Sequence, residues 1–448
     1  MLTRLQVSNF KAWASADVTL GKITGLFGTN SSGKSSILQF ILLLKQTKDA
    51  ADRGISLAMN GVYVTLGSYR DFIHNHDESG KLEWGLSWKE AEDLVIVDPL
   101  KKRSDIFARG KHLAIKSTVG STRGAPRAER LEYRLGQDHR FKLQAKPSEP
   151  TAFDLKAEGG FEFKRALGRA WQLPGPVKAY GLPDQALTYF QNSGFLSQFV
   201  SAFEAQMDRT HYLGPLREPP KRDYVWSRSR PSNVGARGQF AIEAIIAATE
   251  AGEKRNLAPK AHLKPFQEMI AYWLKEMGLV DSFSVEEIKD GSGIYQAKVR
   301  VRPKAPEVLL TEVGFGVSQI LPVLTLLYYV EEGSTILMEQ PEIHLHPLAQ
   351  AGLADVMISV SRRRNIQIIV ESHSEHFLLR LQRRIAENEI DDKDVRLYFC
   401  DVDGPETTLA PLQIDDAGVI ANWPKHFFGD AFGETAAAQK ARLKRRLR

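Results

Sequence analysis

The chain reads Gly28-Thr-Asn-Ser-Ser-Gly-Lys-Ser35, which fits the pattern G-x-x-x-x-G-K-[ST] in full. Two glycines let the backbone curl so that several N–H groups point inward at one phosphate. Lys34 brings a positive charge to the β- and γ-phosphates, and the Ser35 hydroxyl ligates Mg²⁺. The sequence therefore predicts a loop that binds ATP with Mg²⁺. Its predicted residues, with the helix start, are Gly28, Thr29, Asn30, Ser31, Ser32, Gly33, Lys34, Ser35 and Ser36.

The segments on either side of the loop have the pattern that such a loop requires. Residues 23–27 form a short apolar run typical of a buried strand, and residues 36–44 continue as an apolar helix. A helix that begins at the loop adds its N-terminal dipole to the phosphate site. Residues 2–27 together predict two strands.

Length and composition set the broad class of the protein. A chain of 448 residues exceeds what one core usually supports, so we expect at least two lobes or domains. The net charge of +6 permits nucleic-acid contact without requiring it. The single cysteine, Cys400, excludes an internal disulfide and suits a reducing cytosol, so we expect a cytoplasmic protein. We expect no membrane association, because the N-terminus does not resemble a signal peptide and the longest uncharged apolar run, 320–330, is too short to span a bilayer.

Periodicity predicts the organisation of the rest of the chain. Residues 82–165 alternate with period two, which indicates antiparallel strands. Residues 166–280 are mainly helical, and residues 283–302 return to strands. Between 314 and 376 helix and strand patterns alternate, which predicts a mostly parallel sheet. The predicted helices outside this parallel region are 195–207, 241–253, 266–277 and a basic one at 436–448.

Three further motifs carry chemistry. The apolar strand 334–338 ends in Glu339, and an ATPase of this kind needs a carboxylate at a strand end to hold Mg²⁺ through water. Upstream, Gly314-Phe-Gly-Val-Ser-Gln319 begins a helix that we expect to run to about residue 330. Downstream, Ser372-His-Ser374 follows the predicted strand 366–370.

The order of these motifs resembles that of the ABC-class ATPases, and most of all their structural-maintenance-of-chromosomes (SMC) and overcoming-lysogenization-defect (OLD) branch. The stretch Asn422-Trp-Pro-Lys-His-Phe-Phe-Gly-Asp430 resembles a tail of prokaryotic AAA-type ATPases that often belong to phage-defence systems. The middle third is matched only around residues 213–217. The stretches that carry the branch resemblance are Ser8-Asn-Phe-Lys11, Gly314-Phe-Gly-Val-Ser-Gln-Ile-Leu-Pro322, Glu339-Gln-Pro-Glu-Ile-His-Leu-His-Pro347 and Ser372-His-Ser-Glu-His376.

This resemblance implies a role for two more sites. The signature serine, here Ser318, caps a helix whose N-terminus meets the γ-phosphate held by a partner subunit, and Gly316 allows close approach. His373 contacts the γ-phosphate from its own subunit. The resemblance thus implies a homodimer or higher homo-oligomer whose heads close around ATP.

One departure from the ABC pattern concerns hydrolysis. The family places a catalytic glutamate directly after the Mg²⁺-holding acid, whereas this chain has Gln340 there. Glutamine can orient a water molecule but cannot accept its proton as a carboxylate does. Glu342 lies two residues further on and is the alternative base. The sequence leaves slow turnover and a displaced base both open.

Two other features receive a plainer interpretation. His344 and His346 could ligate a metal, but no Cys or third His accompanies them, and they fall where this family has a dimer-contact loop. We do not expect the Toprim nuclease domain found with some OLD relatives, because no paired-carboxylate metal site is evident after His373. Asp415, Asp416, Asp401 and Asp403 are interpreted as solvated loop acids.

The sequence therefore predicts an α/β, two-lobed ABC-type ATPase head with an antiparallel β subdomain and a helical insertion. The leading hypothesis is a sensor or regulator that acts with a separate effector nuclease in prokaryotic anti-phage defence. A DNA-binding repair or chromosome-processing ATPase and a nucleotide-gated scaffold with little turnover are the alternatives, so DNA remains a possible partner. The predicted boundaries are 1–165 for the N-terminal lobe, 166–282 for the insertion, 283–400 for the C-terminal lobe and 401–448 for an extension.

Overall fold

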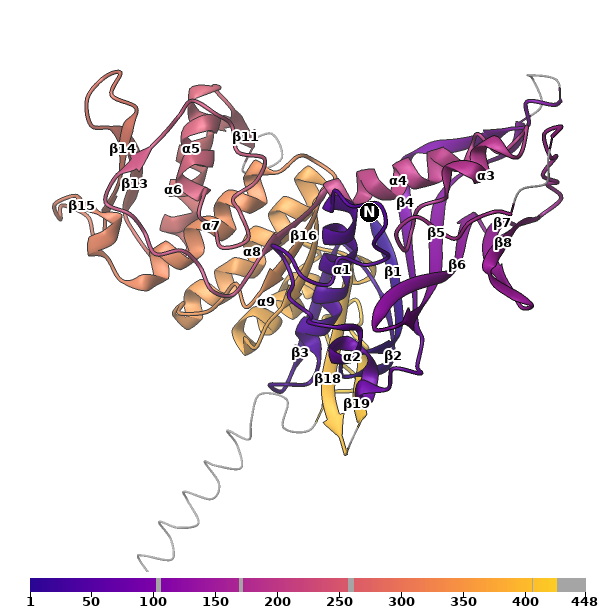
Figure 1. The fold of residues 1–448 in the computed structure, drawn as a ribbon. Helices are drawn as coiled ribbons and strands as arrows, with labels where there is room; N and C mark the ends of the chain where they lie inside the picture. The colour runs from indigo at the N-terminus through magenta and orange to yellow at the C-terminus, as the bar shows by residue number, and fades with distance from the viewer. Residues whose placement is uncertain (102–105, 169–171, 257–261, 405, 425–448) are drawn as a thin grey trace, which may run out of the picture.

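The computed structural model describes residues 1–101, 106–168, 172–256, 262–404 and 406–424. Two large sheets and a helical region make up an α/β fold, as the sequence predicts (Figure 1). The expected basic helix at 436–448 and most of the 422–430 tail lie outside the described residues. Within the described part of the chain, no helix is both long and apolar enough to cross a membrane.

An antiparallel sheet forms one side of the molecule. Its core face is apolar because alternate residues point inward: Leu82, Trp84, Leu86 and Trp88 are all at most 3% exposed. The expectation of antiparallel strands over 82–165 is thus confirmed. The strand order is β2 (Trp13–Thr19), β1 (Leu2–Phe10), β4 (Leu82–Val97), β5 (Ile106–Thr122), β6 (Ala125–Leu135), β7 (His139–Lys146) and β8 (Glu149–Glu158).

The first residues form three strands rather than the two that we expected. β1 ends at Phe10 and β2 begins at Trp13, and β3 (Ile23–Gly28) then joins a different sheet. Lys11 adopts φ 51°, a left-handed conformation that breaks the strand and reverses the chain. The buried residues Val7, Phe10 and Trp13 are three residues apart here, so the period-two pattern is interrupted at this turn.

A second sheet carries the phosphate loop. Its strands are parallel except for the edge strand β19, which pairs antiparallel with β18. The strands β16 and β17 are five-residue runs that are buried throughout, as expected for a parallel sheet covered on both faces. The order is β19 (Glu406–Leu412), β18 (Val395–Asp403), β3, β17 (Gln367–Glu371), β16 (Thr335–Glu339) and β9 (Thr210–Leu213).

Alternate residues of this sheet pack against different helices. Leu26, Leu337 and Ile369 join the core beneath the antiparallel sheet, together with α1 (Lys34–Asp49) and α4 (Leu196–Asp208). Their neighbours on the strands face the opposite core, which is formed with α7 (Phe315–Tyr329), α8 (Pro347–Arg364) and α9 (Glu375–Ala386). The carboxyl ends of the parallel strands therefore meet at one edge, between two packed layers (Figure 1).

The remaining elements lie mostly beyond α7 and α8, on the side away from the antiparallel sheet (Figure 1). There α5 (Ala241–Glu250) and α6 (Phe266–Glu276) pack on α7 and on a small sheet. That sheet contains β10 (Tyr224–Val225), β14 (Ile294–Arg300), β13 (Ser282–Glu287) and β15 (Val308–Leu309). The other short elements are α2 (Tyr69–Phe72), α3 (Asp184–Thr188), β11 (Lys254–Asn256), β12 (Leu263–Pro265) and the 3₁₀ turns His74–His76, Leu310–Glu312 and Asp392–Asp394.

Candidate functional site

The phosphate loop connects β3 to α1, as the motif predicts. Gly28 has φ 139°, and a Cβ atom there would lie 1.9 Å from the carbonyl oxygen of Cys400. Gly33 has φ 78°, and a Cβ atom would lie 2.9 Å from Nε1 of Trp13. Both positions thus require glycine for conformation and for space. Thr29, Asn30 and Ser31 are exposed, while Ser32 is buried and donates to the Thr29 carbonyl at 2.8 Å; Ser36 is buried in the first turn of α1.

The lysine of the motif lies at the centre of this loop. Lys34 Nζ donates to the carbonyl oxygens of Gly28 at 3.2 Å and Thr29 at 2.5 Å, and it lies 3.4 Å from Ser32 Oγ. Burial lowers the pKa of Lys34, and the charge of Glu371 opposes that shift. The ammonium is therefore held inside the loop, where a phosphate oxygen would be its strongest partner.

Two carboxylates lie side by side next to Ser35. Glu339 ends β16 and Glu371 ends β17, and the two residues are partners in the parallel register. Ser35 Oγ donates to Glu371 Oε2 at 2.7 Å. Burial raises the pKa of Glu339 to about 7, with the charge of Glu371 adding to the effect, and burial also raises the pKa of Glu371. A hydroxyl and two carboxylates that repel each other form an oxygen-rich set suited to Mg²⁺.

Glu371 and Tyr212 are site residues that the sequence did not single out. The Tyr212 hydroxyl donates to Glu339 Oε1 at 2.8 Å, which orients that carboxylate. Tyr212 belongs to β9, which pairs with β16 although the two strands are far apart in the chain. A signal for Glu371 was present, since Gln367–Glu371 repeats the pattern of Thr335–Glu339: buried apolar residues that end in glutamate.

The two candidates for hydrolysis occupy different surroundings. Gln340 has φ 44° and its backbone N–H donates to the Glu371 carbonyl at 2.8 Å, so its backbone is fixed beside the carboxylate pair. Glu342 is buried, and its Oε1 accepts from Ser372 Oγ and from the His373 backbone N–H, both at 2.8 Å. Burial raises the pKa of Glu342. The contacts of Glu342 are those of a residue that holds the segment after β17.

His373 lies close to the phosphate loop. Its pKa is lowered by burial and, to a smaller degree, by the charge of Lys34. The structure thus brings His373 and Lys34 to the same edge of the sheet, together with Ser35, Glu339 and Glu371. A neutral imidazole there can donate one hydrogen bond to a phosphate oxygen.

The signature helix α7 departs from expectation at its first turn. Gly314 is the N-cap and offers no side chain, whereas Ser318 lies within the helix and donates to the Phe315 carbonyl at 2.9 Å. The expectation that Ser318 caps the helix is therefore wrong. Ser318 is 6% exposed and Gly316 is half-buried, while Phe315 is 70% exposed. The glycines leave the first N–H groups of α7 without a capping side chain, as at an anion-binding helix start.

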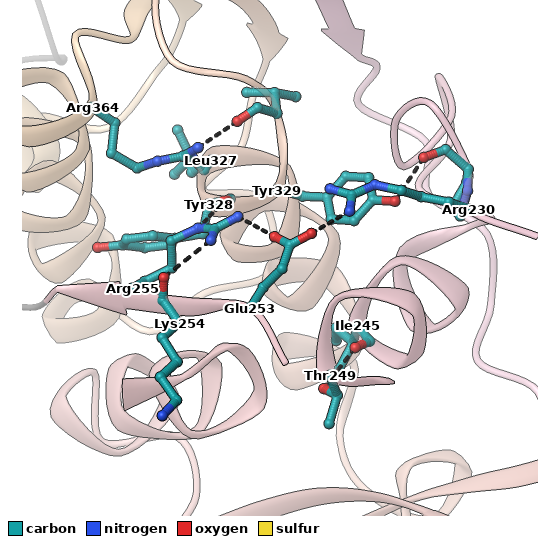
Figure 2. Close-up of polar contacts among 12 residues, drawn as sticks. Arg230, Ile245, Thr249, Glu253, Lys254, Arg255, Leu327, Tyr328, Tyr329 and Arg364 are labelled. Carbon is teal, nitrogen blue, oxygen red and sulfur yellow. Dashed lines mark hydrogen bonds and ion pairs between the residues drawn. The ribbon is translucent and has the colours of Figure 1, made fainter. Parts of the chain in front are cut away.

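The other end of α7 is held by arginines. Arg364 donates to the carbonyl oxygens of Leu327 at 3.1 Å and Val330 at 2.6 Å, and Arg255 donates to the Tyr328 carbonyl at 3.1 Å. Figure 2 shows Glu253 between Arg255 and Arg230, and Glu253 forms an ion pair with each of them. Cations complement the negative end of a helix, so these contacts join α7 to the segment between α5 and α6.

The two histidines of the 339–347 stretch have local contacts. His346 is the N-cap of α8, where its Nδ1 accepts from the Leu348 backbone N–H at 3.4 Å. The His344 ring lies 6.3 Å from the Phe315 ring. Among the described residues, no group of three His, Cys, Asp or Glu side chains could hold a metal ion.

A family model described as AAA ATPase domain matches residues 1–164 and 245–378, which is more than half of the 448 residues. The chain belongs to the AAA ATPase domain family. The matched stretches of this AAA ATPase domain protein contain the phosphate loop, the signature helix and both strand-end glutamates. A second model, described as protein of unknown function (DUF3696), matches residues 390–437, which extend past the described part of the chain.

Among curated proteins, the chain is similar to a protein named OLD nuclease from Thermus scotoductus (strain ATCC 700910 / SA-01). The two are 22% identical over 420 residues, which cover 90% of this chain and 65% of the relative. The chain thus spans less than two thirds of that protein's length.

Solved structures with a similar arrangement are SMC heads. An SmcHead bound to the C-winged helix domain of ScpA aligns with TM-score 0.43 and 11% identity over 93% of this chain and 98% of that one. The SMC head domain from Thermotoga maritima aligns with TM-score 0.41 and 10% identity, over 92% of this chain and 99% of that one. The third structure is an Smc head domain with an extended coiled coil, bound to the C-terminal domain of ScpA and derived from Pyrococcus furiosus. It aligns with TM-score 0.43 and 9% identity, over 92% of this chain and 96% of that one.

Proposed function

We propose that this AAA ATPase domain protein binds ATP with Mg²⁺ and hydrolyses it. The observation that carries the proposal is the meeting of Lys34, Ser35, Glu339 and Glu371 at one sheet edge. Lys34 would hold the β- and γ-phosphates, and Ser35 with the two glutamates would hold Mg²⁺. The metal would neutralise charge that develops on the phosphate oxygens during transfer.

We propose that this site hydrolyses ATP slowly. Gln340 has the fixed backbone of a water-orienting residue, but its amide cannot take a proton. Glu342 is occupied by Ser372 and the His373 backbone, which supports a positioning role rather than that of a base. These contacts also favour a second candidate function, a nucleotide-gated scaffold that binds ATP with little turnover.

A second copy of the chain would complete the binding site for the γ-phosphate. Phe315 at the start of α7 and Leu348 at the start of α8 are 70% and 61% exposed, and a second copy of the chain would cover them. Two heads related by a two-fold axis would each offer the first turn of α7, near Gly316 and Ser318, to the partner's nucleotide. ATP would then hold the two heads together until hydrolysis removes the shared phosphate.

The biological role is a proposal that rests on resemblance. Similarity to OLD nuclease and to phage-defence ATPases supports a sensor or regulator that acts with a separate effector nuclease in prokaryotic anti-phage defence. Genes beside this one that encode a nuclease would support that role. A neighbourhood of repair enzymes, together with salt-dependent DNA binding stimulated by ATP, would instead favour a DNA-processing ATPase.

The direct test of the enzymatic proposal is Mg²⁺-dependent phosphate release from ATP by the full chain. We expect turnover by the wild type above that of Lys34→Ala, and loss of turnover when Mg²⁺ is chelated. If the two proteins release phosphate at equal rates while the wild type still binds ATP, the enzymatic proposal is wrong and the nucleotide-gated scaffold is favoured.

A further inference from the structure

The antiparallel sheet has a hollow on its outer face, beside Gly85 of β4. The neighbours of Gly85 in the chain, Trp84 and Leu86, are buried in the core that contains α1, so Gly85 belongs to the opposite face. Gly85 pairs with Gln6 of β1 and with Lys116 of β5, and its missing side chain leaves room between them. The hollow has a volume of about 310 Å³, which is enough for a small ligand. Its lining includes Gln6, Glu83, Gly85, Lys116, Arg130 and Arg134.

Three cations line the side of the hollow that β5 and β6 form. Lys116 is opposite Glu132 in the register, and Arg130 and Arg134 lie two residues from Glu132 on either side along β6. Glu132 is fully buried and forms an ion pair with each arginine, so its charge is already taken up. Within the described part of the chain, the Lys116 ammonium forms neither a hydrogen bond nor an ion pair. This side of the hollow therefore carries more positive than negative charge.

The cations on this side repel one another. Burial lowers the pKa of Lys116, and the charge of Arg134 adds to that shift. An anion placed between these groups would relieve the repulsion and would favour the charged form of Lys116. Guanidinium groups present N–H donors in a planar fork that fits the oxygen atoms of a phosphate. The β5–β6 side of the hollow is thus suited to a phosphoryl group.

The opposite side of the hollow, formed by β1 and β4, offers acceptors instead. Gln6 Nε2 donates to Asp17 Oδ2 at 3.0 Å, which leaves Gln6 Oε1 on the side of Gly85. A Cβ atom at Gly85 would lie 3.6 Å from that oxygen. Glu83 is exposed and lines the same hollow. Amide and carboxylate oxygens accept hydrogen bonds, so this side is suited to the hydroxyl groups of a ligand.

We propose that the hollow beside Gly85 binds a small phosphorylated sugar, with the phosphate on Lys116, Arg130 and Arg134 and the hydroxyl groups on Gln6 and Glu83. A sugar phosphate and a nucleotide share this chemistry. The hollow lies on the face of the sheet away from α1, so this site is separate from the phosphate loop. The inference does not depend on the proposed ATPase function.

The test is isothermal titration calorimetry on the full chain at low salt, where charges are screened least. The probes are ribose 5-phosphate, AMP, inorganic phosphate and ribose. Every protein carries Lys34→Ala, so that the phosphate loop contributes little to binding. The melting temperature of each variant reports its folding.

Two variants change the hollow in different ways, and a third is the matched control. Lys116→Ala removes the cation that has no partner. Gly85→Val fills the hollow and keeps every charge, and its Cβ atom would lie 3.3 Å from Cγ of the flexible Lys116 side chain. The control is Lys156→Ala, because Lys156 is an exposed lysine of β8 that does not line the hollow. If Gly85→Val does not fold, Gly85→Ala takes its place, with a smaller loss of affinity expected.

We expect ribose 5-phosphate to bind, and Lys116→Ala and Gly85→Val each to weaken that binding by about tenfold or more. Lys156→Ala should stay within about twofold of the parent protein, since an isolated surface charge contributes little. Ribose should not bind, because it lacks the phosphate. Tighter binding of AMP than of ribose 5-phosphate would identify the ligand as a nucleotide, and the reverse order would identify it as a sugar phosphate.

Four results would overturn the inference. The first is no saturable binding of any phosphate compound up to about 10 mM. The second is unchanged affinity in a folded Gly85→Val or Gly85→Ala protein, which would mean that the anion binds outside the hollow. The third is an equal loss in Lys156→Ala and Lys116→Ala, which would mean that the charge of the whole face attracts the anion. The fourth is inorganic phosphate that binds as tightly as ribose 5-phosphate, because the sugar would then make no contact.

Discussion

The phosphate loop and the start of α7 differ in how fully one chain satisfies them. In the loop, Lys34 has three acceptors and Ser35 donates to Glu371. At the start of α7, the N-cap Gly314 has no side chain to bond the first N–H groups, and Phe315 is largely exposed. The loop lysine is bonded within its own chain, and under the proposed function a second copy of the chain would use the start of α7.

In the proposed function, the loop binds the nucleotide and the start of α7 contacts the nucleotide of a second head. The loop would bind ATP in each head alone, so changes there should remove binding. The start of α7 would act only when two heads meet, so changes there should remove hydrolysis and leave binding intact. The following predictions separate the two regions, from the largest expected effect to the smallest.

Lys34→Ala should weaken ATP binding by about 100-fold or more, because it removes the buried cation that faces the phosphates. The change can be measured by titration with fluorescent ATP. Lys45→Ala is the matched control, since Lys45 is also a buried lysine with a lowered pKa but donates to the Met207 carbonyl, away from the loop. Equal affinity for wild type and Lys34→Ala would mean that the phosphates bind elsewhere.

Ser318→Arg should reduce turnover by at least about tenfold while ATP affinity stays within about twofold of wild type. The bulky cation would obstruct the first turn of α7, where the partner's phosphate is expected. Turnover and binding are measured on the same preparation. A parallel loss of ATP affinity would show that α7 serves its own head and would erase the contrast between the two regions.

Gln340→Glu should raise turnover several-fold, because a carboxylate can take the proton that the amide cannot. The backbone of Gln340 is already fixed by its bond to the Glu371 carbonyl, so the substitution adds a base without moving the chain. Single-turnover phosphate release is the measurement. A slower variant would indicate that a further negative charge beside Glu339 and Glu371 outweighs the gain.

Glu339→Gln should stabilise the protein without ligands at pH 8 by roughly 1–3 kcal/mol and change little at pH 5. The pKa of Glu339 is raised to about 7 in the fold, above its ordinary value of 4.5. The folded state therefore binds more protons between these values, and the wild type loses stability as pH rises through that window. Denaturant unfolding at both pH values tests this, and an equal difference at both would exclude the titration of Glu339 as its cause.

Local sequence predicted the loop region well and the rest of the site less well. The phosphate loop is one contiguous motif between a strand and a helix, so its residues lie together whatever the rest of the chain does. Glu371 was missed because its importance comes from its register with Glu339 across two strands. Tyr212 was missed because β9 pairs with β16, a long-range contact that periodicity does not encode.

At the start of α7, the sequence predicted the helix but not its N-cap residue. The glycine–serine pattern predicted the helix and its extent, and α7 spans Phe315–Tyr329. It led us to expect Ser318 as the cap, which is wrong, because serine and glycine are both acceptable at helix starts and Gly314 takes that position. Only the observed bond from Ser318 to the Phe315 carbonyl decides between them.

Mixing Lys34→Ala with Ser318→Arg tests most directly whether two heads share one nucleotide. Each variant alone should be nearly inactive. A mixed pair would join the intact loop of the Ser318→Arg chain to the intact α7 of the Lys34→Ala chain, so an equimolar mixture should recover about a quarter of wild-type turnover. No recovery, with subunit exchange demonstrated and both variants folded, would contradict the account and show that each head works alone.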